Sequence, residues 1–207
     1  MNNLIEWILH PQALIQSAGG WAVVVACVIV FAETGLLVGF FLPGDSLLFV
    51  SGMLIAAGDI KISIWAFCAL IMVSAWLGDQ LGYWIGRRTG PAVFNRPNSK
   101  LFNHKNVEKA HAFFERHGAR AVILAHFVAV IRTFVPVTAG VAELEYPKFL
   151  RYNIIGVIGW AWSIPLLGLF LGKNQVIAKN VEIFTAAVVV VSFIPVILEW
   201  LKRRRAR

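Results

Sequence analysis

The sequence predicts an all-α integral membrane protein, organised as an inverted repeat with two re-entrant helices and with amphipathic helices at the membrane surface. Three observations support this prediction. Apolar residues make up 58% of the 207 residues, and the mean hydropathy is +0.72. These apolar residues gather into runs long enough to cross a bilayer, and the basic residues gather between and after the runs. A soluble domain holds only about 45–50% apolar residues, so lipid is the expected solvent.

The net charge of +8 is concentrated in two segments. Residues 87–120 hold eight Lys/Arg against two Glu, and residues 202–207 hold five Lys/Arg and no acid. A basic chain often binds nucleic acid, but these segments flank apolar runs, which is the pattern of membrane orientation. We therefore expect no nucleic-acid partner. Cys27 and Cys68 lie inside apolar runs and are interpreted as small buried residues, not as a disulfide.

Five apolar runs have the length of a membrane span. A helix needs about 20 apolar residues to cross the hydrocarbon core of a bilayer. The runs are residues 21–42, 62–85, 121–142, 152–172 and 181–201.

Residues 43–58 (PGDSLLFVSGMLIAAG) are equally apolar but too short to cross. A helix of this length reaches only about 24 Å, against a core of roughly 30 Å. The segment begins with Pro-Gly-Asp and contains Gly52 and Gly58. We predict a re-entrant segment that enters and leaves on one side, surrounded by protein or by a water-filled cavity.

Charge parity predicts a second re-entrant segment at residues 121–142. By the positive-inside rule, residues 87–120 and 202–207 both face the cytoplasm, so an even number of crossings must separate them. Three apolar runs lie between, and the run that contains Arg132 and Pro136 is the best candidate to return to its own side. The first re-entrant segment then opens outward and the second inward, as in alternating-access transporters built from inverted repeats.

The predicted organisation is a single membrane domain. The N-terminal helix is placed at the interface because its apolar residues are spaced for one helical face, and the central loop contains an amphipathic helix that faces anionic lipid. In chain order the parts are the interfacial helix 1–20, the first repeat 21–90 with re-entrant segment 43–58, the cytoplasmic amphipathic loop 91–119 with its helix at 103–117, the second repeat 120–201 with re-entrant segment 121–142, and the basic cytoplasmic tail 202–207.

Three acidic residues in the apolar segments are the predicted proton-coupling residues. Glu33 lies in the middle of a run, where a charged group costs about 2.5–3.5 kcal/mol, so it is either functional or hydrogen-bonded to a neighbouring helix. Asp45 stands at the start of the short segment, where a carboxylate can cap the helix as well as exchange protons. Asp79 is interpreted either as a partner of Arg132 or as a proton relay.

The glycines around Asp79 have a different interpretation. Gly78, Gly82, Gly86 and Gly90 recur every four residues. This spacing predicts a face of small residues on which another helix packs closely.

Two basic side chains are the predicted substrate-binding residues. Arg132 cannot deprotonate, so within an apolar run it must be paired, solvated or bound to an anion, and its planar fork suits phosphate. The alternative is a structural ion pair with Glu33, Asp45 or Asp79. His126 lies six residues earlier and is either a satisfied polar group or a ligand. The histidines form no metal-binding pattern with a cysteine or an acid, so no metal or cofactor is expected.

Four segments together resemble the DedA family of bacterial membrane proteins, which is related to the VTT domain of eukaryotic lipid scramblases. The matching pieces occur in the family's order and cover nearly the whole chain. They are Glu33 followed by residues 41–45 (FLPGD), residues 78–87 (GDQLGYWIGR), residues 132–140 (RTFVPVTAG) and residues 152–160 (YNIIGVIGW).

The resemblance implies two re-entrant helices in an inverted repeat and transport coupled to the proton motive force. It implies that Glu33 and Asp45 are the family's acidic pair and that Arg132 is its second arginine. The family's first arginine, followed by Phe and then by Pro and often Gly, is replaced here by the sequence HFVAV of residues 126–130. His126 therefore stands where the family has a permanent positive charge.

The sequence and the resemblance together predict a proton-coupled lipid transporter of the bacterial cytoplasmic membrane. It is a multi-pass protein with a cytoplasmic C-terminus, and not an enzyme. We expect a flippase that recycles undecaprenyl phosphate or a phospholipid. Its expected partners are membrane lipids and protons, and the sequence does not decide whether it forms a homo-oligomer. The alternatives are a proton-driven exporter of small solutes or cations and, less favoured because the chain lacks the nucleophile motifs, a lipid phosphatase.

Overall fold

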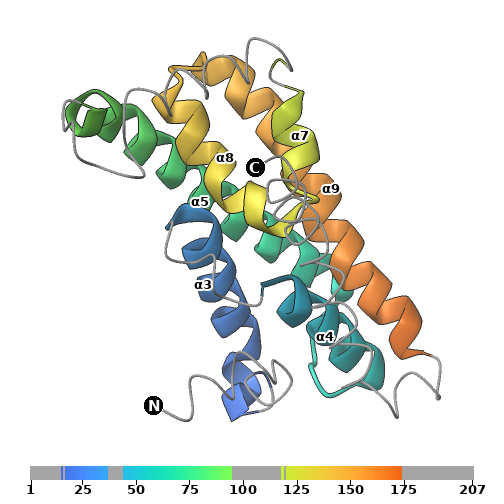
Figure 1. The fold of residues 1–207 in the computed structure, drawn as a ribbon. Helices are drawn as coiled ribbons and strands as arrows, with labels where there is room; N and C mark the ends of the chain where they lie inside the picture. Colours follow the sequence, from blue (N-terminus) through green and yellow to red (C-terminus); the bar gives the residue numbers. More distant parts are fainter. Residues whose placement is uncertain (1–14, 16, 37–43, 95–117, 119, 174–207) are drawn as a thin grey trace, which may run out of the picture. The chain divides into compact units, whose positions relative to one another are not determined.

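The computed structural model describes residues 15, 17–36, 44–94, 118 and 120–173. The elements described there are all helices, as the sequence predicts (Figure 1). They are η1 (Gly19–Trp21), α3 (Ala22–Gly35), α4 (Gly44–Ala57), α5 (Ile64–Phe94), α7 (Ala121–Ala125), α8 (Ala129–Val141) and α9 (Tyr146–Gly172).

Two of these helices are long and apolar enough to cross a membrane. They cover Ile64–Gly90 of α5 and Tyr146–Gly172 of α9, each 27 residues. A helix of that length reaches about 40 Å, which exceeds the hydrocarbon core. Many of their large apolar side chains are exposed, which suits contact with lipid. Helix α5 also continues to Phe94, beyond the apolar run at 62–85 from which it was predicted.

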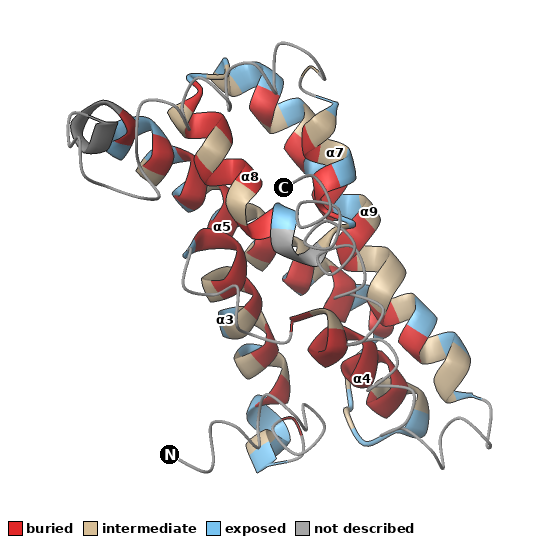
Figure 2. Cartoon of the chain, viewed as in Figure 1, coloured by how far each residue is buried: buried red, intermediate tan, exposed pale blue. Residues whose placement is uncertain are grey.

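Helix α4 coincides with the predicted short segment 43–58. It has 14 residues, Gly44–Ala57, and so reaches only about 21 Å. Nearly every side chain from Gly44 to Leu54 is buried, and Asp45 is the half-buried exception (Figure 2). A short helix that is apolar on all sides and buried on all sides is covered by protein, not by lipid.

The segment 121–142 forms two helices, α7 and α8, with a break between them. The break lies at residues 126–128, and Val128 is extended, with φ −121° and ψ 103°. Pro136 lies in the same predicted re-entrant run but is not where the helix breaks, since α8 continues through it. Proline there cannot donate the helical hydrogen bond to the Arg132 carbonyl oxygen. The backbone is nevertheless helical on both sides of Pro136, from Ala129 to Val141.

The described residues divide into two compact units. One contains residues 17–30, 44–72 and 161–173, and the other contains residues 31–36, 73–94 and 120–160. In the first unit, α4 packs against the C-terminal part of α9. A Cβ at Gly52 would overlap the Pro165 carbonyl oxygen, and a Cβ at Gly168 would overlap that of Phe49, so these backbones are in direct contact.

The second unit is built on the close approach of α5 and α8. A Cβ at Gly86 would overlap the carbonyl oxygen of Val137, and a Cβ at Gly140 would overlap that of Tyr83. The Tyr83 ring stacks on the Phe149 ring of α9, with 4.6 Å between the ring centroids. Its hydroxyl donates to the Leu144 carbonyl oxygen at 2.6 Å. The predicted packing role is confirmed for Gly78, Gly82 and Gly86 of α5.

Several predicted parts lie outside the described residues. They are the N-terminal helix up to residue 14, the amphipathic helix at 103–117, the apolar run at 181–201 and the basic tail 202–207.

Candidate functional site

An ion pair buried in the second unit joins α3 to α8. The Arg132 guanidinium donates a hydrogen bond through Nη2 to Oε1 of Glu33. Glu33 is 3% exposed and Arg132 is 2% exposed. The guanidinium carbon also lies 4.2 Å from the centre of the Trp160 ring of α9, a distance suited to a cation–π contact. The permanent charge of Arg132 is therefore matched by a carboxylate and an aromatic face.

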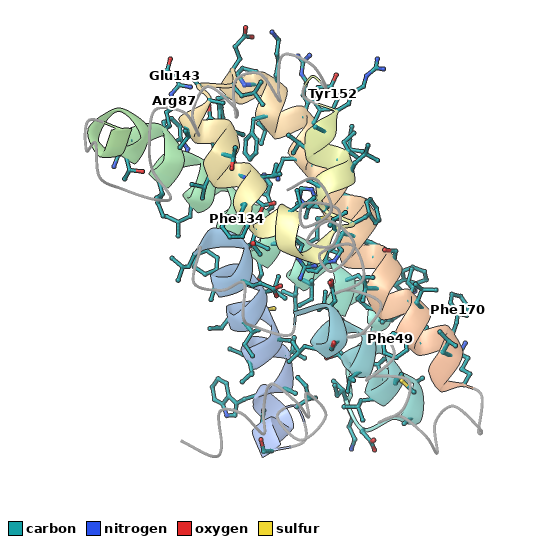
Figure 3. The ribbon with its side chains drawn as sticks, in the orientation of Figure 1. Phe49, Arg87, Phe134, Glu143, Tyr152 and Phe170 are labelled. Carbon is teal, nitrogen blue, oxygen red and sulfur yellow. The ribbon has the colours of Figure 1, made fainter. Side chains whose placement is uncertain are left out.

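The helix break places Arg132 at the start of α8. The Arg132 amide donates to the Val128 carbonyl oxygen at 3.0 Å, so this residue lies in the first turn of the helix. Phe134, on the same helix, is labelled in Figure 3. On the α3 side, Thr34 donates to the Ala75 carbonyl oxygen at 3.3 Å, and a Cβ at Gly78 would overlap its hydroxyl. Close packing of α3 on α5 thus holds the turn that carries Glu33.

A second buried polar group lies in the same unit and connects α5, the α7–α8 break and α9. Nε2 of His126 lies 3.1 Å from Oδ2 of Asp79, and Nδ1 lies 2.8 Å from the Val122 carbonyl oxygen. Asn153 donates through Nδ2 to the same Asp79 oxygen at 2.7 Å. Gln80 donates through Nε2 to Oδ1 of Asn153 at 3.2 Å. Four side chains thus form one continuous hydrogen-bonded chain.

Gly156 of α9 leaves the space that the His126 ring occupies. A Cβ at Gly156 would lie 2.5 Å from Nδ1 of His126 and 3.0 Å from Cγ, so a side chain there would displace the ring. A Cβ at Gly159, one turn later, would lie 3.1 Å from Cζ at the edge of the Phe127 ring. The first position is therefore needed for the site, whereas the second meets the movable end of an exposed side chain.

The structure brings four of the five predicted site residues together in two pairs, Glu33 with Arg132 and Asp79 with His126. The alternative pairing of Asp79 with Arg132 is not the one observed. Asp45 lies in the first turn of α4, which belongs to the other compact unit. Its part in proton coupling stays a prediction.

Three residues with clear contacts had been given no role from the sequence. Asn153, Gln80 and Trp160 complete the two polar groups. Asn153 carried a usable signal, because it is an amide at the start of an apolar run that contains no charge. Trp160 ends the segment 152–160 that resembles the family, but its residue type gave no hint of a role beyond packing, since an aromatic residue in an apolar helix is ordinarily a packing residue.

Metal binding has no candidate in the described part of the chain. Within residues 17–36, 44–94 and 120–173, no group of three or more His, Cys, Asp or Glu side chains could hold a metal ion.

The long apolar helices, the short buried helix and the ion pairs buried beside a helix break together indicate an integral membrane protein with charged groups in its interior. Residues 18–170 match the VTT domain family. The chain belongs to the DedA family of membrane proteins, which carry this domain.

The relatives are similar along most of their length. The chain is 37% identical to Protein DedA of Escherichia coli (strain K12), covering 98% of this chain and 94% of that protein. It is 43% identical to an uncharacterised membrane protein of Mycobacterium tuberculosis (strain ATCC 25618 / H37Rv), over 87% and 79% of the two chains. It is 34% identical to Inner membrane protein YqjA of Escherichia coli (strain K12), over 84% and 76%. No solved structure gives a significant match.

Proposed function

We propose that the protein is a proton-coupled transporter of a lipid phosphate in the bacterial cytoplasmic membrane. The cargo we propose is undecaprenyl phosphate or a phospholipid, flipped from one leaflet to the other. The observation that carries this proposal is the buried ion pair between Arg132 and Glu33. Arg132 lies in the first turn of α8, directly after the helix break that interrupts the apolar segment. A membrane protein retains such costly groups where they bind or move a charged cargo.

The chemistry of the pair supports an anionic cargo. Arginine keeps its charge at all accessible pH values, and its fork binds carboxylate and phosphate in the same geometry. A phosphate and the Glu33 carboxylate therefore compete for Arg132. When phosphate binds, Glu33 is displaced, and a proton neutralises it because an uncompensated buried carboxylate is costly. When phosphate leaves, Glu33 gives up the proton and returns to Arg132.

This exchange links the binding of cargo to the binding of a proton at the ion pair itself. One proton is bound as the anion enters, and one is released as it departs. An exporter of cations is less well supported, because the acid that would bind the cation is engaged with arginine. Asp45, in the first turn of α4, is proposed as a second proton-accepting group on the transport path.

We also propose that α4 and the α7–α8 segment are the two re-entrant elements of an inverted repeat. The short length and burial of α4 support the first, and the interruption at residues 126–128 supports the second. In this topology residues 87–120 and the C-terminal tail are cytoplasmic and Asp59 is outside.

Labelling of single cysteines with a membrane-impermeant reagent tests the topology. The background is Cys27→Ala/Cys68→Ala. Labelling from the periplasmic side is expected at position 59, and from the cytoplasmic side at positions 100 and 204. Opposite sides for positions 100 and 204 would contradict the even number of crossings and, with it, the second re-entrant segment.

Transport is tested in liposomes that contain the purified full chain. Fluorescent polyprenyl phosphate, phosphatidylglycerol and phosphatidylethanolamine are followed from one leaflet to the other, with and without an imposed proton gradient. The parent is expected to move a phosphate-bearing lipid faster when the gradient is present, and Arg132→Ala and Glu33→Gln are expected to abolish that movement. Arg151→Ala removes an exposed arginine of α9 and is the matched control. Equal rates for the parent and Arg132→Ala would refute the proposal.

A further inference from the structure

The hydrogen-bonded group formed by Asp79, His126 and Asn153 lies apart from the ion pair just described and has its own chemistry. We propose that this group is a proton-binding site, in which one proton is held between Nε2 of His126 and Oδ2 of Asp79. The proposal replaces the phosphate-binding role expected for His126 from the sequence. Its link to transport rests on the proposed function, whereas the binding of the proton does not.

The first step concerns Nδ1 of His126. This nitrogen lies 2.8 Å from the Val122 carbonyl oxygen, and a carbonyl oxygen can only accept a hydrogen bond. Nδ1 must therefore carry a hydrogen. A neutral imidazole has one N–H, so in its neutral form His126 would present a lone pair at Nε2.

The second step concerns the other ring nitrogen. Nε2 lies 3.1 Å from Oδ2 of Asp79. With a neutral ring and a carboxylate, two lone pairs would face one another across this distance. One further proton converts the repulsion into a charge-assisted hydrogen bond. Because Asn153 donates to the same oxygen at 2.7 Å, the imidazolium–carboxylate form is the one we expect.

Charge balance in an apolar interior supports the same conclusion. With the proton bound, the positive imidazolium and the negative carboxylate sum to zero. Without it, the pair carries one negative charge, and both side chains are buried, at 3% and 1% exposed. An uncompensated charge in such surroundings is costly. The site is therefore expected to release its proton only when another charge nearby changes.

Asn153 allows the proton to leave without stranding a polar atom. Its Nδ2 has two hydrogens and lies 2.7 Å from Oδ2 of Asp79 and 3.5 Å from Nε2 of His126. Gln80 donates to its Oδ1 and so fixes the amide with Nδ2 toward the pair. When the proton is present, Asn153 serves the carboxylate alone. When the proton is absent, the second hydrogen can turn to Nε2, so the group is satisfied in both states, unlike a static ion pair.

The other charged and titratable groups named here, on the helices around the site, are either paired elsewhere or lie at the edge of the unit. Arg87 donates to the Tyr83 hydroxyl at 2.9 Å, and Arg132 is paired with Glu33. Tyr152 packs at the edge of the apolar cluster, and Arg151 is exposed. In the proposed transport step the charge that changes within the same unit is that of the Glu33–Arg132 pair, where phosphate replaces the Glu33 carboxylate.

The proton is detected by nitrogen NMR of the full chain in nanodiscs, with ¹⁵N-labelled histidine. The His126 signals are assigned with His126→Gln. At neutral pH both ring nitrogens of His126 are expected to carry protons. Asp79→Asn is expected to remove the proton from Nε2 and leave the one on Nδ1. An unprotonated Nε2 in the parent, or an unchanged spectrum in Asp79→Asn, would overturn the proposal.

A second pair of variants keeps the test valid if Asp79→Asn fails to fold. Gly156→Ala displaces the imidazole ring and is expected to separate Nε2 from the carboxylate, with loss of the Nε2 proton. Gly159→Ala, which meets only the Phe127 ring edge, is the matched control and is expected to keep the parent spectrum. Loss of the proton in both variants, or in neither, contradicts the arrangement.

The transport assay separates the two proposals. Asp79→Asn is expected to lose the acceleration by a proton gradient while retaining slow lipid movement, whereas Arg132→Ala loses both. If the parent moves no lipid but its His126 holds both protons, the proposed function fails and the proton site stands. If lipid moves and His126 is neutral, the proton site fails and the proposed function stands.

Discussion

The two buried polar groups of the second unit hold their charge in different ways. The Glu33–Arg132 pair contains a cation that never loses its proton, so its state changes only when one anion replaces another. The Asp79–His126–Asn153 group contains an imidazole, which in the proposal above holds one proton against the Asp79 carboxylate. In the proposals above, the first group exchanges one anion for another while Glu33 takes up a proton, and the second group exchanges a proton alone.

The contrast extends to the way each group is built. The ion pair joins α3 and α8 through two side chains over an aromatic face. The proton site joins three elements through a chain of amides, and the backbone of α9 approaches the ring where Gly156 leaves room. A permanent charge needs only an opposite charge beside it, whereas a group that titrates needs partners that suit both of its states.

Arg132→Ala is expected to have the largest effect. It leaves the Glu33 carboxylate buried without its cation, and should lower the free energy of unfolding by about 3–5 kcal/mol. Glu33→Ala/Arg132→Ala removes both charges and should recover part of that loss, although transport stays abolished. Unfolding of the purified protein in detergent measures the stability. If the double variant were as unstable as Arg132→Ala, the unpaired Glu33 carboxylate would not be the cause of the lost stability.

Gly86→Ala should lower the free energy of unfolding by an intermediate amount. It should disturb the Glu33–Arg132 pair more than the Asp79–His126–Asn153 group. The new Cβ overlaps the Val137 carbonyl oxygen and displaces α8, which carries Arg132. Overpacking of this kind costs about 1–3 kcal/mol.

Gly82→Ala is the matched control on the same face of α5, because its Cβ would lie 3.3 Å from the Pro136 Cβ. Its effect should be smaller than about 1 kcal/mol, since alanine also favours the helix by a similar amount. Thermal unfolding in detergent measures both variants, and the ¹⁵N signals of His126 should stay unchanged in each. Equal destabilisation by the two substitutions would contradict the close approach of α5 and α8.

Trp160→Phe should have the smallest effect. It keeps an aromatic face under Arg132 but weakens the cation–π contact, which contributes about 0.5–2 kcal/mol. In an Arg132→Ala background the same substitution should cost less, because the cation is gone. The difference between the two backgrounds, measured by unfolding, is the contribution of the contact. A difference of zero would mean that Trp160 serves only for packing.

The helical class, the membrane as solvent and the position of each polar residue along its apolar run could all be predicted from the sequence. Hydropathy and charge are local properties, so the long spans in α5 and α9 and the short helix α4 could be predicted from stretches of about 15–30 residues. The family could be recognised for a similar reason, since its motifs are short and in order.

Which polar residues contact one another could not be predicted without the packing of the helices. Glu33 and Arg132 are 99 residues apart, and Asp79 and His126 are 47 apart. The choice of Glu33 over Asp79 as the partner of Arg132, and of Asp79 as the partner of His126, depends on how α3, α8 and α9 pack on α5. The position of the helix break, at Val128 and not at Pro136, likewise could not be predicted from the local sequence. These pairs form because the glycines of α5 and α9 let the helix backbones approach closely. Distances between helices cannot be predicted from a local pattern of hydropathy.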